Sequence, residues 1–182
     1  SAADLNRDGW LDLVFTANRE GKKPSTIRGG SAGGFSEDRK TVLDLKTKQC
    51  ANITVADLNR DGWLDLIYND DYFGTMHIFW GSEKGYSGEA SWSRFTSGGS
   101  VGLADLNGDG FLDFVIAGAF DPKKKSPNSK TRVFWGTAAG TPSFENVIEL
   151  EAYQCCEVAL ADLNRDRHLD LVCGNYMSET TR

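Results

Sequence analysis

A nine-residue acidic pattern, D-x-N-x-D-x-x-x-D, occurs four times in this 182-residue chain. The copies span residues 4–12, 57–65, 105–113 and 162–170. Each copy brings three carboxylates and one amide oxygen to a short loop. Ca²⁺ takes six to eight oxygen ligands from such side chains and from main-chain carbonyls. The pattern therefore predicts four calcium sites, built from side chains at loop positions 1, 3, 5 and 9 and from the carbonyl at position 7.

The predicted ligand residues share the same positions in each loop, and the position-7 residue contributes only its carbonyl. In chain order they are Asp4, Asn6, Asp8, Trp10 and Asp12; Asp57, Asn59, Asp61, Trp63 and Asp65; Asp105, Asn107, Asp109, Phe111 and Asp113; and Asp162, Asn164, Asp166, His168 and Asp170. Turn formation is the competing explanation, because Asp and Asn also cap their own backbone. We expect capping to use one or two carboxylates per loop, so the third favours a cation that relieves their repulsion.

Position 6 sets the fourth loop apart from the other three. Gly9, Gly62 and Gly110 stand there in the first three loops, as expected where the backbone turns sharply with positive φ. The fourth loop has Arg167, for which that conformation costs on the order of 1–2 kcal/mol. We therefore expect the fourth loop to be the weakest of the four sites.

The residues that follow each loop argue against an EF-hand. An EF-hand places a bidentate Glu at position 12, where this chain has Phe15, Tyr68, Ile116 and Cys173. The runs leading to those residues, 11–15, 64–68, 112–116 and 169–173, are short, apolar and rich in β-forming residues. They predict strands rather than helices on the carboxyl side of every loop.

The four motifs also define a repeat, with starts near residues 4, 57, 105 and 162. Periods of this length are typical of propeller blades or solenoid units. The second period predicts strands at 53–57, 64–69, 76–80 and 90–95, and the third at 101–105, 113–117, 131–135 and 144–150. Four-stranded units without helices favour an all-β β-propeller. Five tryptophans recur at repeat positions, and we expect them in the blade cores: Trp10, Trp63, Trp80, Trp92 and Trp135.

Almost the whole chain resembles the FG-GAP or VCBS-type repeats of the integrin α-subunit propeller. The resemblance rests on ADLNRDGWLDLVF, ADLNRDGWLDLIY, ADLNGDGFLDFVI and ADLNRDRHLDLVC, and on FWGSEKGYS and FWGTAAGTPSF at the family's aromatic-glycine turn. It implies that the acidic turns bind Ca²⁺ through the residues named above. The first repeat has 27–30, Ile-Arg-Gly-Gly, where the others have aromatic residues, so its third strand is a weaker match.

The strand count predicts about three and a half four-stranded blades in one propeller segment, 1–182, as part of a seven-bladed ring. Known propellers have about four to eight blades. The remaining blades belong either to a longer chain or to a second copy that completes the ring as a homo-oligomer. We favour the longer chain, because an open blade leaves unpaired edge strands.

Composition excludes several functional classes. The formal net charge is −6, but the loops hold 12 of the 26 acidic residues, and four bound Ca²⁺ would add eight positive charges to give +2. An acidic domain without an extended basic face is not expected to bind nucleic acid. No apolar run approaches the ~20 residues of a membrane span, so membrane insertion is not expected.

Four cysteines leave the redox state open. Cys155 and Cys156 are adjacent and allow a strained vicinal disulfide, while Cys173 replaces an apolar residue of the other repeats and is expected as a buried thiol. Cys50 has no partner that the sequence identifies. Disulfides and free thiols both stay possible on the sequence alone.

No catalytic motif stands apart from the acidic loops, so we predict that the chain is not an enzyme. Turns between the first and second strands of each blade lie on one face, which leaves the opposite face for an extracellular or cell-surface protein or glycan. Exposed aromatic residues suit such recognition. The aromatic candidates on that face are Tyr72, Phe73, Phe120, Tyr153 and Tyr176. The alternatives are an assembly subunit of an extracellular polymer and an accessory domain of a larger polysaccharide-processing enzyme.

Overall fold

The computed structural model describes residues 1–16, 25–43, 52–70, 74–87, 90–96, 98–118, 130–151 and 155–175. Nearly all regular structure within these ranges is β-strand, and the helix among them is a single 3-10 turn, η1 (Glu37–Arg39). Short runs of β-branched and aromatic residues separated by glycine-rich turns account for this composition of elements. The all-β prediction is therefore confirmed.

The strands form three four-stranded sheets and one two-stranded sheet, each an antiparallel meander that follows chain order. The first sheet holds β1 (Ala2–Ala3), β2 (Asp12–Phe15), β3 (Ser25–Arg28) and β4 (Lys40–Leu43); the second β5 (Asn52–Ala56), β6 (Asp65–Asp70), β7 (Thr75–Phe79) and β8 (Trp92–Phe95); the third β9 (Gly98–Ala104), β10 (Asp113–Gly118), β11 (Thr131–Phe134) and β12 (Ile148–Leu150); the fourth β13 (Cys155–Ala161) and β14 (Asp170–Asn175). These are the predicted three and a half blades of a β-propeller.

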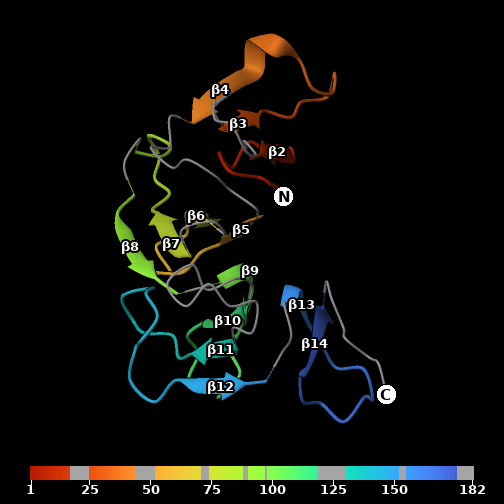
Figure 1. The fold of residues 1–182 in the computed structure, drawn as a ribbon. Helices are drawn as coiled ribbons and strands as arrows, with labels where there is room; N and C mark the ends of the chain where they lie inside the picture. Colours follow the sequence, from red (N-terminus) through yellow and green to blue (C-terminus); the bar gives the residue numbers. More distant parts are fainter. Residues whose placement is uncertain are drawn as a thin grey trace.

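Figure 1 shows the four sheets following one another in chain order along an arc. Hydrogen bonds join the first strands of neighbouring sheets. Thr54 on β5 donates from Oγ1 to the carbonyl of Val101 on β9 at 3.0 Å. The N–H of Val158 on β13 donates to Oγ of Ser100 on β9 at 2.9 Å. First strands that lie side by side are what a radial arrangement of blades requires.

Three apolar clusters fill the spaces between successive sheets, and they repeat one pattern. Positions are counted from the first aspartate of each motif, so that positions 10 to 12 lie on the strand after the loop. The residue at position 2 of the loop and the residue at position 11 of the strand pack toward the next sheet. Positions 10 and 12 of that next sheet pack back against them. Between the first two sheets these residues are Leu5 and Val14, which meet Leu66 and Tyr68; the later clusters repeat the arrangement with Leu58 and Ile67 against Phe114 and Ile116, then Leu106 and Val115 against Leu171 and Cys173.

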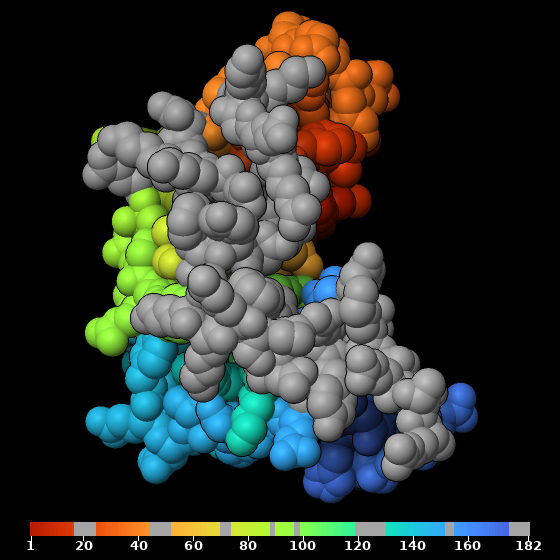
Figure 2. Space-filling view, in the orientation of Figure 1, coloured from red at the N-terminus to blue at the C-terminus, as the bar shows by residue number. Residues whose placement is uncertain are grey.

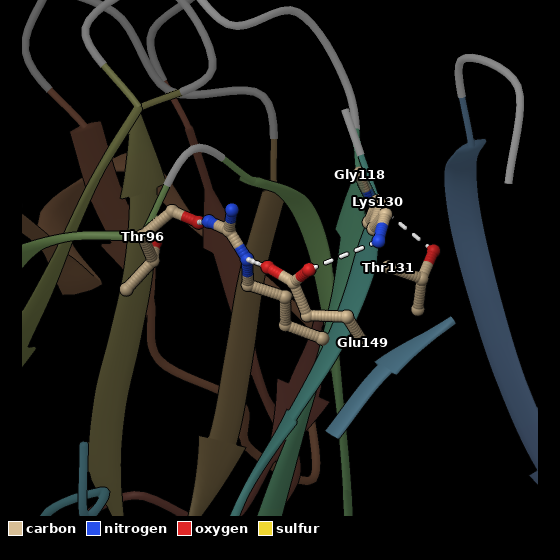
Figure 3. A network of polar contacts seen from close by, with 6 residues as sticks. Thr96, Gly118, Lys130, Thr131 and Glu149 are labelled. Carbon is tan, nitrogen blue, oxygen red and sulfur yellow. Dashed lines mark hydrogen bonds and ion pairs between the residues drawn. The ribbon is translucent and has the colours of Figure 1, made fainter. Parts of the chain in front are cut away.

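A polar network ties the second and third sheets at the ends of their strands that lie away from the acidic loops (Figure 3). Arg132 on β11 donates from its guanidinium to Glu149 on β12 at 3.1 Å and to the carbonyl of Thr96 at 3.3 Å. Lys130 contacts the other oxygen of Glu149 at 3.1 Å. These cations lower the pKa of Glu149. The network therefore links neighbouring blades on the face opposite the loops.

Several local expectations differ from the structure. The last strand of the third sheet is only Ile148–Leu150, because Phe144 instead packs against the ring of Phe134, with centroids 5.1 Å apart. Trp10 is not a core residue, because it is 46% exposed. The third strand of the first repeat, where the match at 27–30 is weaker, forms as β3 and ends before the two glycines.

The cysteines within the described residues are free thiols: Cys155, Cys156 and Cys173. Cys155 is buried, and burial raises the pKa of its thiol to about 11. Cys173 packs against the third apolar cluster as a partly buried residue. No vicinal disulfide joins Cys155 to Cys156, and Cys50 lies outside the described residues.

Candidate metal centres

Each acidic loop connects the first two strands of its sheet and is held at the same register. The alanine before the loop pairs with the aspartate at position 9, as in Ala56 opposite Asp65 and Ala104 opposite Asp113. The first and fourth loops close in the same way. The hairpin register therefore places all four loops equivalently, at the ends of their strands.

Short-range hydrogen bonds shape the loops, and the second loop shows the pattern. The N–H of Gly62 donates to Oδ2 of Asp57 at 2.9 Å, and the N–H of Asp61 donates to Oδ1 of Asn59 at 3.0 Å. The N–H of Trp63 donates to Oδ1 of Asp61 at 2.8 Å, while the side-chain amide of Asn59 donates to Oδ2 of the same Asp61 at 3.0 Å. Equivalent bonds recur in the other three loops.

The aspartate at position 9 joins the loop to the rest of its blade. Oδ2 of Asp65 accepts the N–H of Leu58 at 2.8 Å, and its Oδ1 accepts the N–H of Gly81 at 2.9 Å. A Cβ on Gly81 would lie 2.3 Å from the carbonyl oxygen of Leu64, so only glycine allows this approach. Asp12 and Asp113 make the same pair of bonds in their own blades.

Two backbone positions of every loop adopt the left-handed conformation. Position 6 has φ of 86° to 90° at the three predicted glycines, and Arg167 takes the same conformation at 73°. The N–H of Arg167 donates to Asp162 at 2.9 Å, as the glycines donate in their loops. Position 4 is also left-handed, at 60° to 64° for its three arginines and 74° for Gly108, which the sequence did not predict. The fourth loop therefore keeps the common backbone despite its arginine.

The third carboxylate of each loop has a structural role in the absence of a cation. All three aspartates of each loop accept backbone N–H groups, so our expectation that capping uses only one or two is wrong. Within the described residues, no three side chains of His, Cys, Asp or Glu come together as a metal site. The predicted ligands thus lie in common loops, and their role as ligands stays a prediction.

One loop atom nevertheless fits a cation. Oδ1 of Asp57 is buried and has no hydrogen-bond partner among the described residues, whereas Oδ1 of Asp105 accepts the N–H of Gly108 at 2.8 Å. A buried carboxylate oxygen without a partner carries a high free-energy cost. Carboxylate oxygens each keep a second lone pair after accepting one N–H group. The donor set of the loops is therefore compatible with a hard cation that takes oxygen ligands.

The electrostatics differ between buried and exposed carboxylates. Burial raises the pKa of Asp65 above 3.8; backbone hydrogen bonds oppose the shift, and nearby Asp61 and Asp57 add to it. The N–H of Phe111 and the amide of its loop asparagine instead lower the pKa of the exposed Asp109. A cation would act most strongly on the buried carboxylate, because its charge is the least solvated.

Not every predicted site residue can be placed. The aromatic candidates at positions 72, 73, 120, 153 and 176 all lie outside the described residues, so their ligand-binding role stays a prediction. Among the position-7 residues, Trp10, Trp63, Phe111 and His168 donate their N–H groups to loop aspartates. The use of their carbonyls as ligands also stays a prediction.

A cavity of about 580 Å³ beside the first loop was not predicted. Its wall combines Asp8 and Asp12 with Asp38, Arg39 and Lys84. These residues come from three separate segments of the first two sheets, so no sequence motif contains them. Two of its walls belong to sequence signals, the first acidic loop and the aromatic-glycine turn at 79–87, but neither signal places them beside each other. The mixture of charges favours a polar occupant.

The sequence profile of the FG-GAP-like repeat family matches this chain three times, over residues 4–68, 57–116 and 105–173. Chicken (Gallus gallus) integrin alpha-6 is 27% identical over 137 residues, which is 69% of this chain and 12% of that protein. The chain therefore spans only a small part of this relative. In the described part of the chain, no helix is both long and apolar enough to cross a membrane.

Proposed function

Because the chain belongs to the FG-GAP-like repeat family, we propose that its four acidic loops bind Ca²⁺ and stabilise a propeller module that recognises a protein or glycan outside the cell. The similarity to integrin alpha-6 supports an extracellular or cell-surface location and a protein partner. The proposal gives Ca²⁺ a structural role and gives the chain no catalytic role.

The buried, unpartnered Oδ1 of Asp57 carries the calcium proposal. Asp57, Asn59, Asp61 and Asp65 would supply the side-chain oxygens of that site, and the cation would offset the repulsion among three carboxylates. The other three loops have the same donors at the same positions. Magnesium fits less well, because it demands a smaller octahedral shell and keeps more of its water.

Calcium titration of the metal-free chain tests the proposal. We expect heat release on binding and a rise in melting temperature that EDTA reverses. A site at 100 times its Kd adds about 2.7 kcal/mol, and 1 kcal/mol shifts the melting temperature of a chain this size by roughly 2–4 °C. Each occupied loop should therefore raise it by about 5–10 °C. A melting curve that Ca²⁺ and EDTA leave unchanged would contradict the proposal.

A matched pair of variants assigns the effect to a loop. Asp57→Asn removes one loop carboxylate and should lower the calcium stoichiometry by one. Glu83→Gln makes the same charge change at an exposed residue outside the loops and should leave the stoichiometry unchanged. Equal effects of the two variants would indicate nonspecific binding to an acidic surface.

A further inference from the structure

The third acidic loop differs from the other three at position 4. Gly108 stands there, whereas the other loops have Arg7, Arg60 and Arg165. Position 3 is an asparagine in every loop, so the third loop contains the dipeptide Asn-Gly, which occurs nowhere else in the chain. In this dipeptide the asparagine side chain reacts most readily with the following main-chain nitrogen, because glycine has no Cβ to hinder the approach. The third loop therefore carries a chemical reactivity that its three counterparts lack.

The reaction of such a dipeptide begins with closure of a cyclic imide. The nitrogen of Gly108 adds to Cγ of Asn107, the bond between Cγ and Nδ2 breaks, and ammonia leaves with the proton of the Gly108 N–H. Water then opens the imide and is the only co-reactant. Attack of water at Cγ gives aspartate, whereas attack at the main-chain carbonyl carbon gives isoaspartate.

Hydrogen bonds of the third loop engage both reacting groups. The N–H of Gly108 donates to Oδ1 of Asp105 at 2.8 Å, so a carboxylate draws on the proton that the nitrogen must lose. Oδ1 of Asn107 accepts the N–H of Asp109 at 2.9 Å, and Nδ2 of Asn107 donates to Oδ2 of Asp109 at 2.9 Å. A main-chain donor on the amide oxygen stabilises the negative charge that develops there when the nitrogen adds to Cγ. These bonds favour closure of the imide.

The second loop shares the bonds to the asparagine but lacks the bond at position 4. Asn59 bonds to Asp61 as Asn107 bonds to Asp109. The N–H of Arg60 donates to no carboxylate in the described part of the chain. The two loops therefore differ both in the residue that follows the asparagine and in the acceptor of its N–H.

The reacting groups of the third loop are open to solvent. The third sheet, teal to light blue, forms the lower left of the surface in Figure 2, and Asn107, Gly108 and Asp109 in its acidic loop are exposed. A Cβ on Gly108 would have no atom within 4 Å. Apolar clusters pack this sheet against a neighbour on each side, yet the loop stays exposed. Water therefore reaches the carbonyl groups that it must attack.

From these observations we propose that Asn107 is a site of spontaneous modification, at which the folded chain converts asparagine through the imide to aspartate and isoaspartate. Both products give the third loop a fourth carboxylate. Isoaspartate also routes the main chain through Cβ and Cγ, which displaces the acceptor of the Asp109 N–H. The modification uses the bonds of the loop itself and does not depend on bound metal.

Peptide mapping by mass spectrometry tests the proposal on the purified chain, kept in EDTA at neutral pH in water labelled with heavy oxygen. Each conversion takes one oxygen from the solvent, so the label identifies conversion during the incubation. We expect Asn107 to convert at least about tenfold faster than Asn59, because the nitrogen after Asn59 belongs to an arginine. An isoaspartyl methyltransferase should detect isoaspartate in the same peptide.

Substitutions at position 4 separate the effect of the glycine from that of the loop. Gly108→Arg gives the third loop the Asn-Arg pair of the other loops, and Gly108→Ala adds only a Cβ. Each should slow the conversion of Asn107 at least about tenfold. Arg60→Gly is the reciprocal variant and should speed the conversion of Asn59 by a similar factor. Circular dichroism should show the same fold for all three variants, because position 4 is an exposed loop position.

Three outcomes would overturn the proposal. If Asn107 stays intact in the folded chain, whether or not it converts in urea, the loop holds the amide away from the nitrogen. Equal rates at Asn107 and Asn59 would show that the glycine does not direct the reaction. A Gly108→Ala chain that keeps its fold and converts as fast as the wild type would exclude the nitrogen of Gly108 as the controlling group.

Discussion

The second and fourth acidic loops have the same motif and nearly the same internal hydrogen bonds, yet their surroundings differ. The one difference within the loops is that Oδ1 of Asp162 accepts the N–H of Asp166, whereas Oδ1 of Asp57 has no partner among the described residues. Leu58 is 3% exposed and Leu163 is 64% exposed, although both stand at position 2. Asp65 accepts two backbone N–H groups, one of them from Gly81 in the turn after β7, whereas Asp170 accepts only that of Leu163 within the described residues. The comparison shows that the loop forms locally and that neighbouring strands and sheets decide how deeply it is buried.

The largest expected effect separates the two aspartates at position 9. Asp65→Ala should lower the free energy of unfolding by about 3–6 kcal/mol, because two buried N–H groups lose a charged acceptor worth roughly 1.5–3 kcal/mol each. Asp170→Ala should cost much less, because it removes one bond at an exposed residue. Urea unfolding in EDTA measures both without metal. Similar losses for the two variants would mean that burial does not distinguish the loops.

Exchanging glycine and arginine at position 6 should change the free energy of unfolding with opposite signs in the second and fourth loops. Gly62→Arg should destabilise by about 2 kcal/mol, because it strains a backbone at φ 87° and displaces Arg7 from Trp63. Arg167→Gly relieves similar strain but adds backbone entropy to the unfolded chain, for a net gain of up to about 1 kcal/mol. Thermal unfolding of both variants checks the signs. Destabilisation by Arg167→Gly would mean that its side chain makes a favourable contact.

The stability costs of removing the arginines at position 4, Arg60 and Arg165, should differ by a smaller amount. The guanidinium of Arg60 lies over the ring of Phe111, 4.8 Å from its centroid. Arg60→Ala should therefore cost about 0.5–1 kcal/mol, the range for an exposed cation–π contact. Arg165→Ala should leave the stability unchanged, because Arg165 is exposed and lies over no aromatic ring of the described residues. A double-mutant cycle with Phe111→Ala isolates the contact between Arg60 and Phe111. A coupling energy near zero would show that this contact does not stabilise the packing between blades.

The smallest expected effect is a titration shift at Asp65. Burial raises its folded pKa above 3.8, so the folded state favours its protonated form. This carboxyl therefore destabilises the metal-free fold as the pH rises from the unfolded pKa through the folded one, and it has no such effect at lower pH. Carboxyl NMR of the metal-free chain should give a midpoint above 3.8. Calcium should lower that midpoint, and no response to Ca²⁺ would exclude Asp65 as a ligand.

Much of the fold was predictable because the acidic motif and the apolar run after it recur four times in the sequence. Short apolar runs rich in β-forming residues after each motif predicted the second strand of every sheet, and the strand count predicted the three and a half blades. The shortened β12 was not predictable, because Phe144 packs on Phe134, a contact outside its own segment. Trp10 was misassigned to the core, because its equivalents Trp63 and Phe111 are half-buried beneath the arginines Arg7 and Arg60 of the preceding loops, whereas Trp10 is 46% exposed.

The candidate site was predicted less completely than the fold. The motif predicted the acidic loops and the left-handed glycines at position 6, while the role of the loop oxygens as metal ligands stays a prediction. It did not reveal that every aspartate caps the backbone, because the acceptor of a given N–H depends on the folded loop. The partner of Asp65 on Gly81 is 16 residues away, and the wall of the cavity beside the first loop is assembled from three segments.

The hexapeptide ADLNRD occurs unchanged at 3–8, 56–61 and 161–166, and it separates what each level of structure decides. The sequence by itself determined the loop conformation, because its hydrogen bonds join residues two to five positions apart. Only the tertiary structure decided that Leu58 is buried and Leu163 exposed, and that Arg60 has an aromatic partner while Arg165 has none among the described residues. The physical reason is that burial depends on a neighbouring sheet, which identical residues do not share.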